Sequence, residues 1–170
     1  MGFSPNEGLV MSTRSGDIDS GVITYLQNRA GLSANEMDKL LNKSSGLLGL
    51  SGISDDMKTI LSSDSPNADL AVELYCYRVK KYIGAYMAAL NGVDVILFGG
   101  GVGENSPVIR EKIIRDMQWC GLHLDQSANE NAVGTEARIS SADSKIDVMV
   151  VPVDEAAVMA KEALKVMGQL

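Results

Sequence analysis

The apolar positions of this 170-residue chain recur mainly with helical spacing. The longest such stretch covers residues 67–90, where apolar side chains return every three or four positions. Shorter stretches with the same spacing cover residues 20–29 and 33–41. The second of these opens with Ser33 and Glu36, a capping box that satisfies the first backbone N–H groups of a helix. We therefore predict three helices in the first half of the chain.

Two other segments of the first half lack this spacing. Residues 8–14 form a short apolar stretch that breaks at a Ser-Gly-Asp turn, and we predict an extended segment there. Residues 44–54 hold too much Gly and Ser for a helix interior and too many apolar side chains for a free linker. We expect this second segment to be a loop packed against the body of the protein.

The second half of the chain shows the order strand, turn, helix twice. Residues 93–98 are a β-branched apolar run, typical of a buried parallel strand, and lead into the glycine-rich segment 99–105. A Ser-Pro pair at residues 106–107 then begins a helix. Residues 148–151 form a second strand, followed by a turn at 152–155 and a last helix. This order predicts an α/β fold.

Composition narrows the classes of function. Hydrophobic residues make up 45% of the chain and charged residues 22%, as in a globular protein, and the length suits a single domain. The 22 acidic and 15 basic residues give a net charge of −7, so a nucleic-acid backbone is repelled. Cys76 and Cys120 lie far apart, so the sequence suggests no disulfide framework. No apolar run approaches membrane-spanning length. We expect a cytoplasmic protein with no nucleic-acid or membrane partner.

The segment 99–105 is a candidate nucleotide site. It has four glycines within five positions after a strand, which allows a phosphate to approach the backbone and the start of the next helix. The dinucleotide fingerprint G-x-G-x-x-G fails, because its third glycine falls on Glu104 or Ser106. A Walker A sequence does not occur. The alternative is that the glycines serve only a tight strand-to-helix turn.

Two charged residues are candidates for the chemistry of a phosphate. Arg14 follows the first extended segment, and a guanidinium has the planar set of donors that fits a phosphoryl group. Its alternative is a surface ion pair with Asp17. Glu155 lies between the second strand and the last helix, where a carboxylate can hold Mg²⁺ or simply favour the helix N-terminus.

A third candidate region follows the Gly-Ser-rich segment. Asp55, Asp56 and Lys58 stand together there and can reach the hydroxyl groups of a nucleotide. An ordinary N-cap and first helical turn is the alternative interpretation of the same residues.

Three separated segments together resemble one family, the acetate kinases of the actin, hexokinase and heat-shock chaperone ATPase superfamily. Residues 3–19 are similar to the signature F-T-P-L-E-G-L-x-M-G-T-R-S-G-D-[IVL]-D-P. Residues 98–107 resemble F-T-G-G-I-G-E-N-S, and residues 151–159 resemble I-P-T-[ND]-E-E-L-x-I. The order and spacing of the three segments also agree with the family, so the resemblance covers almost the whole chain.

The resemblance implies an activity and a set of site residues. The activity is the reversible transfer of the γ-phosphoryl group of ATP to acetate, which gives acetyl phosphate and ADP. Arg14 then matches the catalytic arginine that stabilises the transferring phosphoryl group, and Glu155 matches the Mg²⁺ ligand. The nucleotide-binding positions are Asp56, Met57, Lys58, Gly101, Val102, Gly103, Glu104 and Asn105.

The resemblance also implies a fold and partners. The expected fold is the carboxyl-terminal part of a ribonuclease H-like unit, a mixed sheet flanked by helices and lacking its first strands. The amino-terminal half of the enzyme, which supplies the rest of the site, is the expected partner, and the exposed sheet edge and the family favour a homodimer. Lys58 stands where the family has arginine, which loses the planar donors. Acetate, propionate and butyrate stay open as acceptors, as does a non-catalytic nucleotide-binding or dimerising role.

Overall fold

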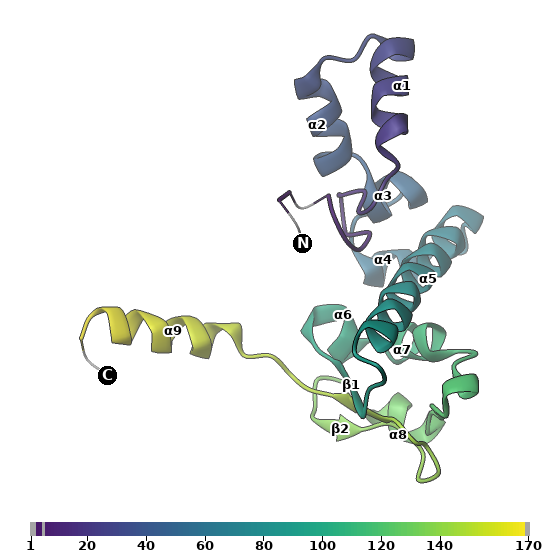
Figure 1. Ribbon diagram of the computed structural model, residues 1–170, viewed down its shortest axis with the longest axis vertical. Helices are drawn as coiled ribbons and strands as arrows, with labels where there is room; N and C mark the ends of the chain where they lie inside the picture. Colours follow the sequence, from purple (N-terminus) through teal and green to yellow (C-terminus); the bar gives the residue numbers. More distant parts are fainter. Residues whose placement is uncertain (1–2, 5, 169–170) are drawn as a thin grey trace. The chain divides into compact units, whose positions relative to one another are not determined.

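The computed structural model describes residues 3–4 and 6–168, apart from the side chain of Glu155. Figure 1 shows the ribbon, coloured along the sequence. The chain divides into two compact units, Met1–Asn91 and Gly92–Leu170, and each is described by itself. The prediction of a single domain stays a prediction.

Five helices make up the described part of the first unit. Helices α1 and α2 lie side by side, and the long helix α5 packs against α3 and α4 (Figure 1). Predicted helices 20–29, 33–41 and 67–90 are confirmed as α1, α2 and α5. The buried apolar side chains include Met37, Leu41 and Val72. The bounds are α1 Ser20–Ala30, α2 Ala34–Lys43, α3 Gly46–Ser51, α4 Met57–Leu61 and α5 Pro66–Ala89.

Two expectations for the first unit are wrong in their secondary structure. The segment 44–54 contains helix α3, although its composition indicated a loop; it does pack inward, since Leu47 is only 3% exposed. The segment 8–14 is not a strand but an irregular loop. The two errors have one cause, because the first N–H groups of α3 donate to carbonyl groups of this loop. This long-range pairing overrides the local propensities of both segments.

The second unit contains a mixed sheet flanked by helices, as the resemblance implies. Strand β3 lies between the other two, parallel to β1 and antiparallel to β2. The carboxyl-terminal residues of the parallel strands, Phe98 and Val150, are partners in the register. The strands are β1 Val95–Phe98, β2 Ala137–Arg138 and β3 Asp147–Val150. The helices are α6 Gly100–Asn105, α7 Pro107–Ile114, the 3₁₀ turn η1 Gln118–Cys120, α8 Gln126–Asn131 and α9 Glu155–Val166.

Burial differs sharply between the two parallel strands. The central strand β3 buries Val148 and Val150 completely, whereas β1 exposes 44% of Val95 and 62% of Leu97. The predicted strand 93–98 is therefore present, but its predicted burial is wrong, because β1 forms an edge of the described sheet. The described side chains of α9 are also exposed. Among the described residues, no helix is long and apolar enough to cross a membrane.

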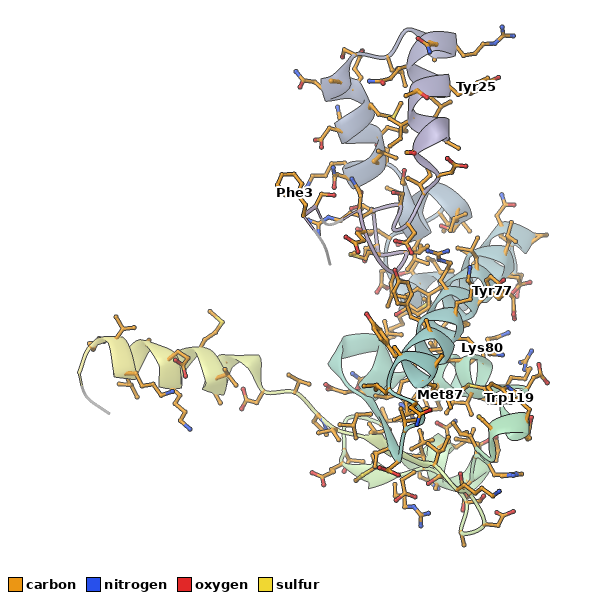
Figure 2. The ribbon with its side chains drawn as sticks, viewed as in Figure 1. Phe3, Tyr25, Tyr77, Lys80, Met87 and Trp119 are labelled. Atoms are coloured by element: carbon orange, nitrogen blue, oxygen red, sulfur yellow. The ribbon has the colours of Figure 1, made fainter. Side chains whose placement is uncertain are left out.

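Side chains of the described residues are drawn in Figure 2. Two aromatic rings that it labels, Tyr25 on α1 and Trp119 in η1, are 62% and 76% exposed. They therefore add little to the core of either unit.

Candidate functional site

The backbone around Arg14 is clamped between two helix ends. On one side, N–H groups at the start of α3 donate to the carbonyl oxygens of residues 11–13 over 2.9–3.0 Å. On the other side, the last carbonyl groups of α2 accept from the Ser15 N–H at 3.0 Å and from the Thr13 hydroxyl at 2.9 Å. Both helix ends thereby satisfy backbone groups that their own helix leaves unpaired. The segment that carries Arg14 is held in place through its main chain.

Gly46, the first residue of α3, allows this close approach. Its φ of +64° lies in the left-handed region that favours glycine. A β-carbon at this position would lie 2.2 Å from the Met11 carbonyl oxygen and 2.7 Å from the carbonyl oxygen of Arg14. Any side chain here would therefore push the Arg14 segment away from α3.

The Asp17 carboxylate is bound by groups other than Arg14. Its Oδ2 accepts hydrogen bonds from Nη2 of Arg78 at 2.5 Å and from the Tyr82 hydroxyl at 2.7 Å, both on α5. Its Oδ1 accepts from the Gly8 N–H at 2.7 Å. The Tyr82 hydroxyl, then the Gly8 N–H and Arg78, lower the pKa of Asp17, and the same contact raises the pKa of Tyr82. The alternative of an Arg14–Asp17 ion pair is therefore wrong.

Arg14 itself is half-buried, and its backbone carbonyl oxygen accepts from the Met11 N–H at 3.2 Å. Within the described part of the chain, its guanidinium has no recorded hydrogen bond or ion pair. A cavity of about 460 Å³ lies beside its neighbour Ser15, with Asp17 and Arg78 in its wall. The main chain fixes this residue while its five N–H donors stay available to a ligand.

The predicted nucleotide residues of α4 have different surroundings. Asp56 is the N-cap of the helix, and its Oδ2 accepts from the Thr59 N–H and hydroxyl at 2.9 and 2.8 Å. Those two contacts, the hydroxyl first, lower the pKa of Asp56. Met57 is buried in the core, whereas Lys58 is exposed. The N-cap alternative is thus present, and the nucleotide role of these three residues stays a prediction.

The glycine-rich segment forms helix α6 rather than an open loop. Its five predicted nucleotide-binding residues, 101–105, therefore lie on one short helix after β1. Glycine is a poor helix former, so side chains hold the turn. The Asn105 amide donates to the Gly101 carbonyl at 2.9 Å, and Arg110 donates to the carbonyl groups of Gly103 and Glu104 at 2.8 and 3.1 Å.

Arg110 is a residue whose role the sequence did not reveal. It has no exposed surface, and burial lowers the pKa of its guanidinium. Its other hydrogen bonds go to the side chain and carbonyl of Asn129 and to the carbonyl of Ala132, over 2.6–2.9 Å. All five recorded acceptors are uncharged oxygens. Two of them, the carbonyl oxygens of Gly103 and Glu104, lie at the end of α6. A charged position inside an apolar helix face was the available signal, since Ile109 and Ile113 around it are buried.

The Glu155 side chain lies outside the described residues, so its metal role is untested. Nearby carboxylates already have partners: Oδ1 of Asp154 accepts from the Ala157 N–H as the N-cap of α9, and Oε1 of Glu104 accepts two backbone N–H groups. Among the described residues, no group of three metal-binding side chains occurs.

The first unit thus presents an arginine on a clamped loop, and the second a glycine-rich helix at the carboxyl end of a parallel strand. Both features are typical of proteins that handle phosphorylated small molecules. The model of the Acetokinase family matches residues 1–161. The chain belongs to this family, which confirms the resemblance of its three motifs.

Relatives and solved structures agree with this membership. An acetate kinase from Bacteroides thetaiotaomicron is 49% identical over 170 residues, covering 98% of this chain and 43% of the relative. The crystal structure of Porphyromonas gingivalis acetate kinase matches with a TM-score of 0.90 at 46% identity, over 96% of this chain and 42% of that one. A propionate kinase from Francisella tularensis subsp. tularensis SCHU S4 matches with a TM-score of 0.87 at 38% identity, over 95% and 42%. The chain spans less than half the length of these relatives.

Proposed function

We propose that this chain is the nucleotide-binding half of an acetate kinase-type phosphotransferase. In the proposed reaction, an acetate oxygen forms a bond to the γ-phosphorus of ATP while the bond from that phosphorus to the β,γ-bridging oxygen breaks. The products are acetyl phosphate and ADP, and the reaction is reversible. Membership of the Acetokinase family supports this proposal.

The Arg14 segment is the observation that carries the proposal. Phosphoryl transfer depends mostly on positioning and on stabilising the negative charge of three equatorial oxygens. A guanidinium on a fixed backbone meets both needs, because its donors are in place before the charge develops. The hydrogen bonds of Asp17 with α5 support this role, since they engage the carboxylate that lies three positions after Arg14 in the sequence. We assign Arg14 as the catalytic residue of this half.

The remaining assignments follow the family resemblance. Nucleotide binding falls to Asp56, Met57 and Lys58 on α4 and to residues 101–105 on α6, with Glu155 as the protein ligand of Mg²⁺. The metal, when bound with the nucleotide, neutralises phosphate charge. Because Met57 is buried, a nucleotide contact at this position involves its backbone. A cytoplasmic location and a homodimer are part of the same proposal.

The amino-terminal half of the enzyme is the proposed partner chain. The exposed apolar side chains of β1, Val95 and Leu97, support it, because an unpaired edge strand with such residues favours pairing. The test mixes this chain with the amino-terminal half of an acetate kinase relative and measures ADP formation. Acetate-dependent turnover supports the proposal, and a folded complex without turnover contradicts it.

Two other candidates are kept because an observation favours each. The structural match to a propionate kinase favours a longer acyl acceptor, and kcat/KM for acetate, propionate and butyrate in the reconstituted enzyme ranks the three. The exposed apolar side chains on the edge strand β1 favour a non-catalytic nucleotide-binding or dimerising role. Calorimetry of the isolated chain with Mg·ADP, together with its molar mass in solution, tests this second candidate.

A further inference from the structure

Glu104 joins the two loops that follow the parallel strands of the second unit. Its Oε1 accepts a hydrogen bond from the N–H of Gly100, at the start of α6, over 2.8 Å. The same oxygen accepts from the N–H of Val153, in the loop between β3 and α9, over 2.9 Å. One carboxylate oxygen therefore links segments that are far apart in the sequence.

The two loops also pack closely. The Val151 N–H donates to the Phe98 carbonyl at 2.9 Å and so extends the pairing of the strands by one residue. Beyond that point, a β-carbon on Gly99 would lie 3.0 Å from Cγ2 of Val153 and 3.3 Å from the Val151 carbonyl oxygen. The loops meet where residue 99 has no side chain, and the Glu104 carboxylate bridges them next to this contact.

Glu104 is held firmly enough to fix the second loop. Its backbone carbonyl accepts from Arg110 and from the Gly134 N–H, both at 3.1 Å, and its side chain is half-buried. The backbone from which the carboxylate extends is thus held in part by the buried Arg110. Segment 151–154, which leads into α9, is the part that the contact restrains.

A direct bond from this carboxylate to a nucleotide phosphate is unfavourable. An ionised carboxylate only accepts hydrogen bonds, as phosphate oxygens do, and the two charges repel. Its Oε1 moreover occupies the Gly100 N–H that an anion at the start of α6 would need. The nucleotide-binding role proposed for Glu104 therefore consists in shaping the site rather than in a contact of its carboxylate with the phosphates.

We propose that Glu104 is a positioning residue whose carboxylate fixes segment 151–154 against α6. It thereby sets the backbone position at which α9 begins with Glu155. Only the function assigned to Glu155 rests on the proposed phosphotransferase activity. The contact itself is a property of the second unit.

The first experiment measures amide hydrogen exchange of the full 170-residue chain by NMR. Glu104→Ala removes the acceptor, so the Val153 and Gly100 amides should exchange about tenfold faster, as expected for the loss of one hydrogen bond. Glu104→Gln keeps a carbonyl oxygen and should stay near the wild-type rates. Glu136→Ala, at an exposed carboxylate of the same unit, is the matched control and should change neither amide.

Unchanged Val153 exchange in Glu104→Ala would overturn the proposal, as would exchange in Glu104→Gln as fast as in the alanine variant. The Val148 amide of the buried strand reports whether each variant is folded. If Glu104→Ala does not fold, Glu104→Asp replaces it, because its shorter side chain cannot reach both N–H groups, and the same acceleration is expected.

The second experiment uses the enzyme reconstituted with its amino-terminal half. Glu104→Ala should raise the Mg²⁺ concentration for half-maximal rate about tenfold, with Glu104→Gln restoring it and the KM for acetate unchanged. An unchanged Mg²⁺ requirement together with faster Val153 exchange would overturn the link to Glu155. If the wild-type mixture has no acetate-dependent turnover, the proposed function fails, while the exchange data still decide the contact.

Discussion

The guanidinium of Arg78 pairs with the carboxylate of Asp17 at 2.5 Å, across 61 positions of sequence. Asp17 stands only three positions after Arg14 and was the obvious partner for that arginine on the basis of sequence. By binding Asp17 from α5, Arg78 and Tyr82 leave the Arg14 guanidinium with its charge available. The predictions for Arg14 and for Tyr82 follow from the pairing of Asp17 with α5 instead of with Arg14.

The loss of the Arg14 guanidinium should affect the chemical step. In the reconstituted enzyme, Arg14→Ala is expected to lower kcat by about 10³-fold or more, in the range found for arginines that stabilise transferring phosphoryl groups. The KM for ATP should change little, because the interaction is strongest in the transition state. Steady-state kinetics with ATP and acetate measure both constants.

Arg29→Ala is the control for this variant, since Arg29 is exposed in the last turn of α1 and should leave kcat unchanged. An Arg14→Ala enzyme with normal kcat and a raised KM would assign Arg14 to ground-state binding instead.

The Tyr82 phenol should report the Asp17 contact directly. Its pKa is raised above the ordinary value of 10.0, chiefly by the hydrogen bond to Asp17. Because this pKa is raised, the contact stabilises the folded state below about pH 10. This stabilisation is lost as the pH rises through the folded-state pKa. In Asp17→Asn the Tyr82 pKa should fall, as measured by NMR titration of ¹³C-labelled tyrosine.

Asp19→Asn, two positions further along, should leave the Tyr82 titration as it is in the wild type. No fall in the Asp17→Asn variant would mean that the two side chains are not in contact in solution. For Asp17 itself the sign is opposite: its pKa is lowered, so its contribution to stability is present above the ordinary pKa of 3.8 and is lost as the pH falls through the folded-state pKa.

Gly46 and Gly52 form a matched pair for the clamp on the Arg14 segment. They flank α3 with φ values of +64° and +65°, but only Gly46 faces backbone atoms at contact distance. Gly52→Ala should cost about 1 kcal/mol of unfolding free energy for the left-handed backbone alone. Gly46→Ala should cost about 3 kcal/mol or more, because its β-carbon also displaces the loop. Urea unfolding followed by circular dichroism measures both, and equal costs would contradict the packing of the loop on α3.

Local sequence patterns were sufficient to predict three helices of the first unit and the fold class of the second. Helices α1, α2 and α5 followed from apolar spacing and capping residues, because those signals lie within the helix itself. The family motif at residues 3–19 likewise indicated Arg14, because the match includes the residues of the loop around this arginine. The order of strand, turn and helix also gave the α/β class of the second unit.

Other features depended on partners that are distant in the sequence. Helix α3 looked like a loop because its N–H groups are satisfied by the backbone of residues 11–13, which no local rule takes into account. The partner of Asp17 and the link from Glu104 to Val153 are long-range contacts of the same kind. The exposure of β1 follows from its place at the edge of the described sheet, whereas its apolar sequence is that of a buried strand. Sequence patterns predicted the groups that we propose to carry the chemistry, but not the residues that hold them in place.

Arg110 offers the last prediction, because it is the buried group that holds the end of α6. Arg110→Lys keeps the positive charge but replaces a planar set of five donors with one ammonium group, which cannot reach both α6 and the end of α8. At least two buried carbonyl groups then lose their partner. The expected loss is about 3 kcal/mol of unfolding free energy, at about 1–3 kcal/mol for each unsatisfied group.

The measurement is urea unfolding monitored by the fluorescence of Trp119, which lies in the same unit as Arg110. Arg29→Lys, at an exposed position in the last turn of α1, is the control for the chemical change and should cost less than about 0.5 kcal/mol. Arg110→Met separates the hydrogen bonds from the charge, since it fills part of the volume with neither. If Arg110→Met has the same unfolding free energy as the wild type, the carbonyl groups around residue 110 have other partners in solution. This result would contradict the role of Arg110 in holding the end of α6.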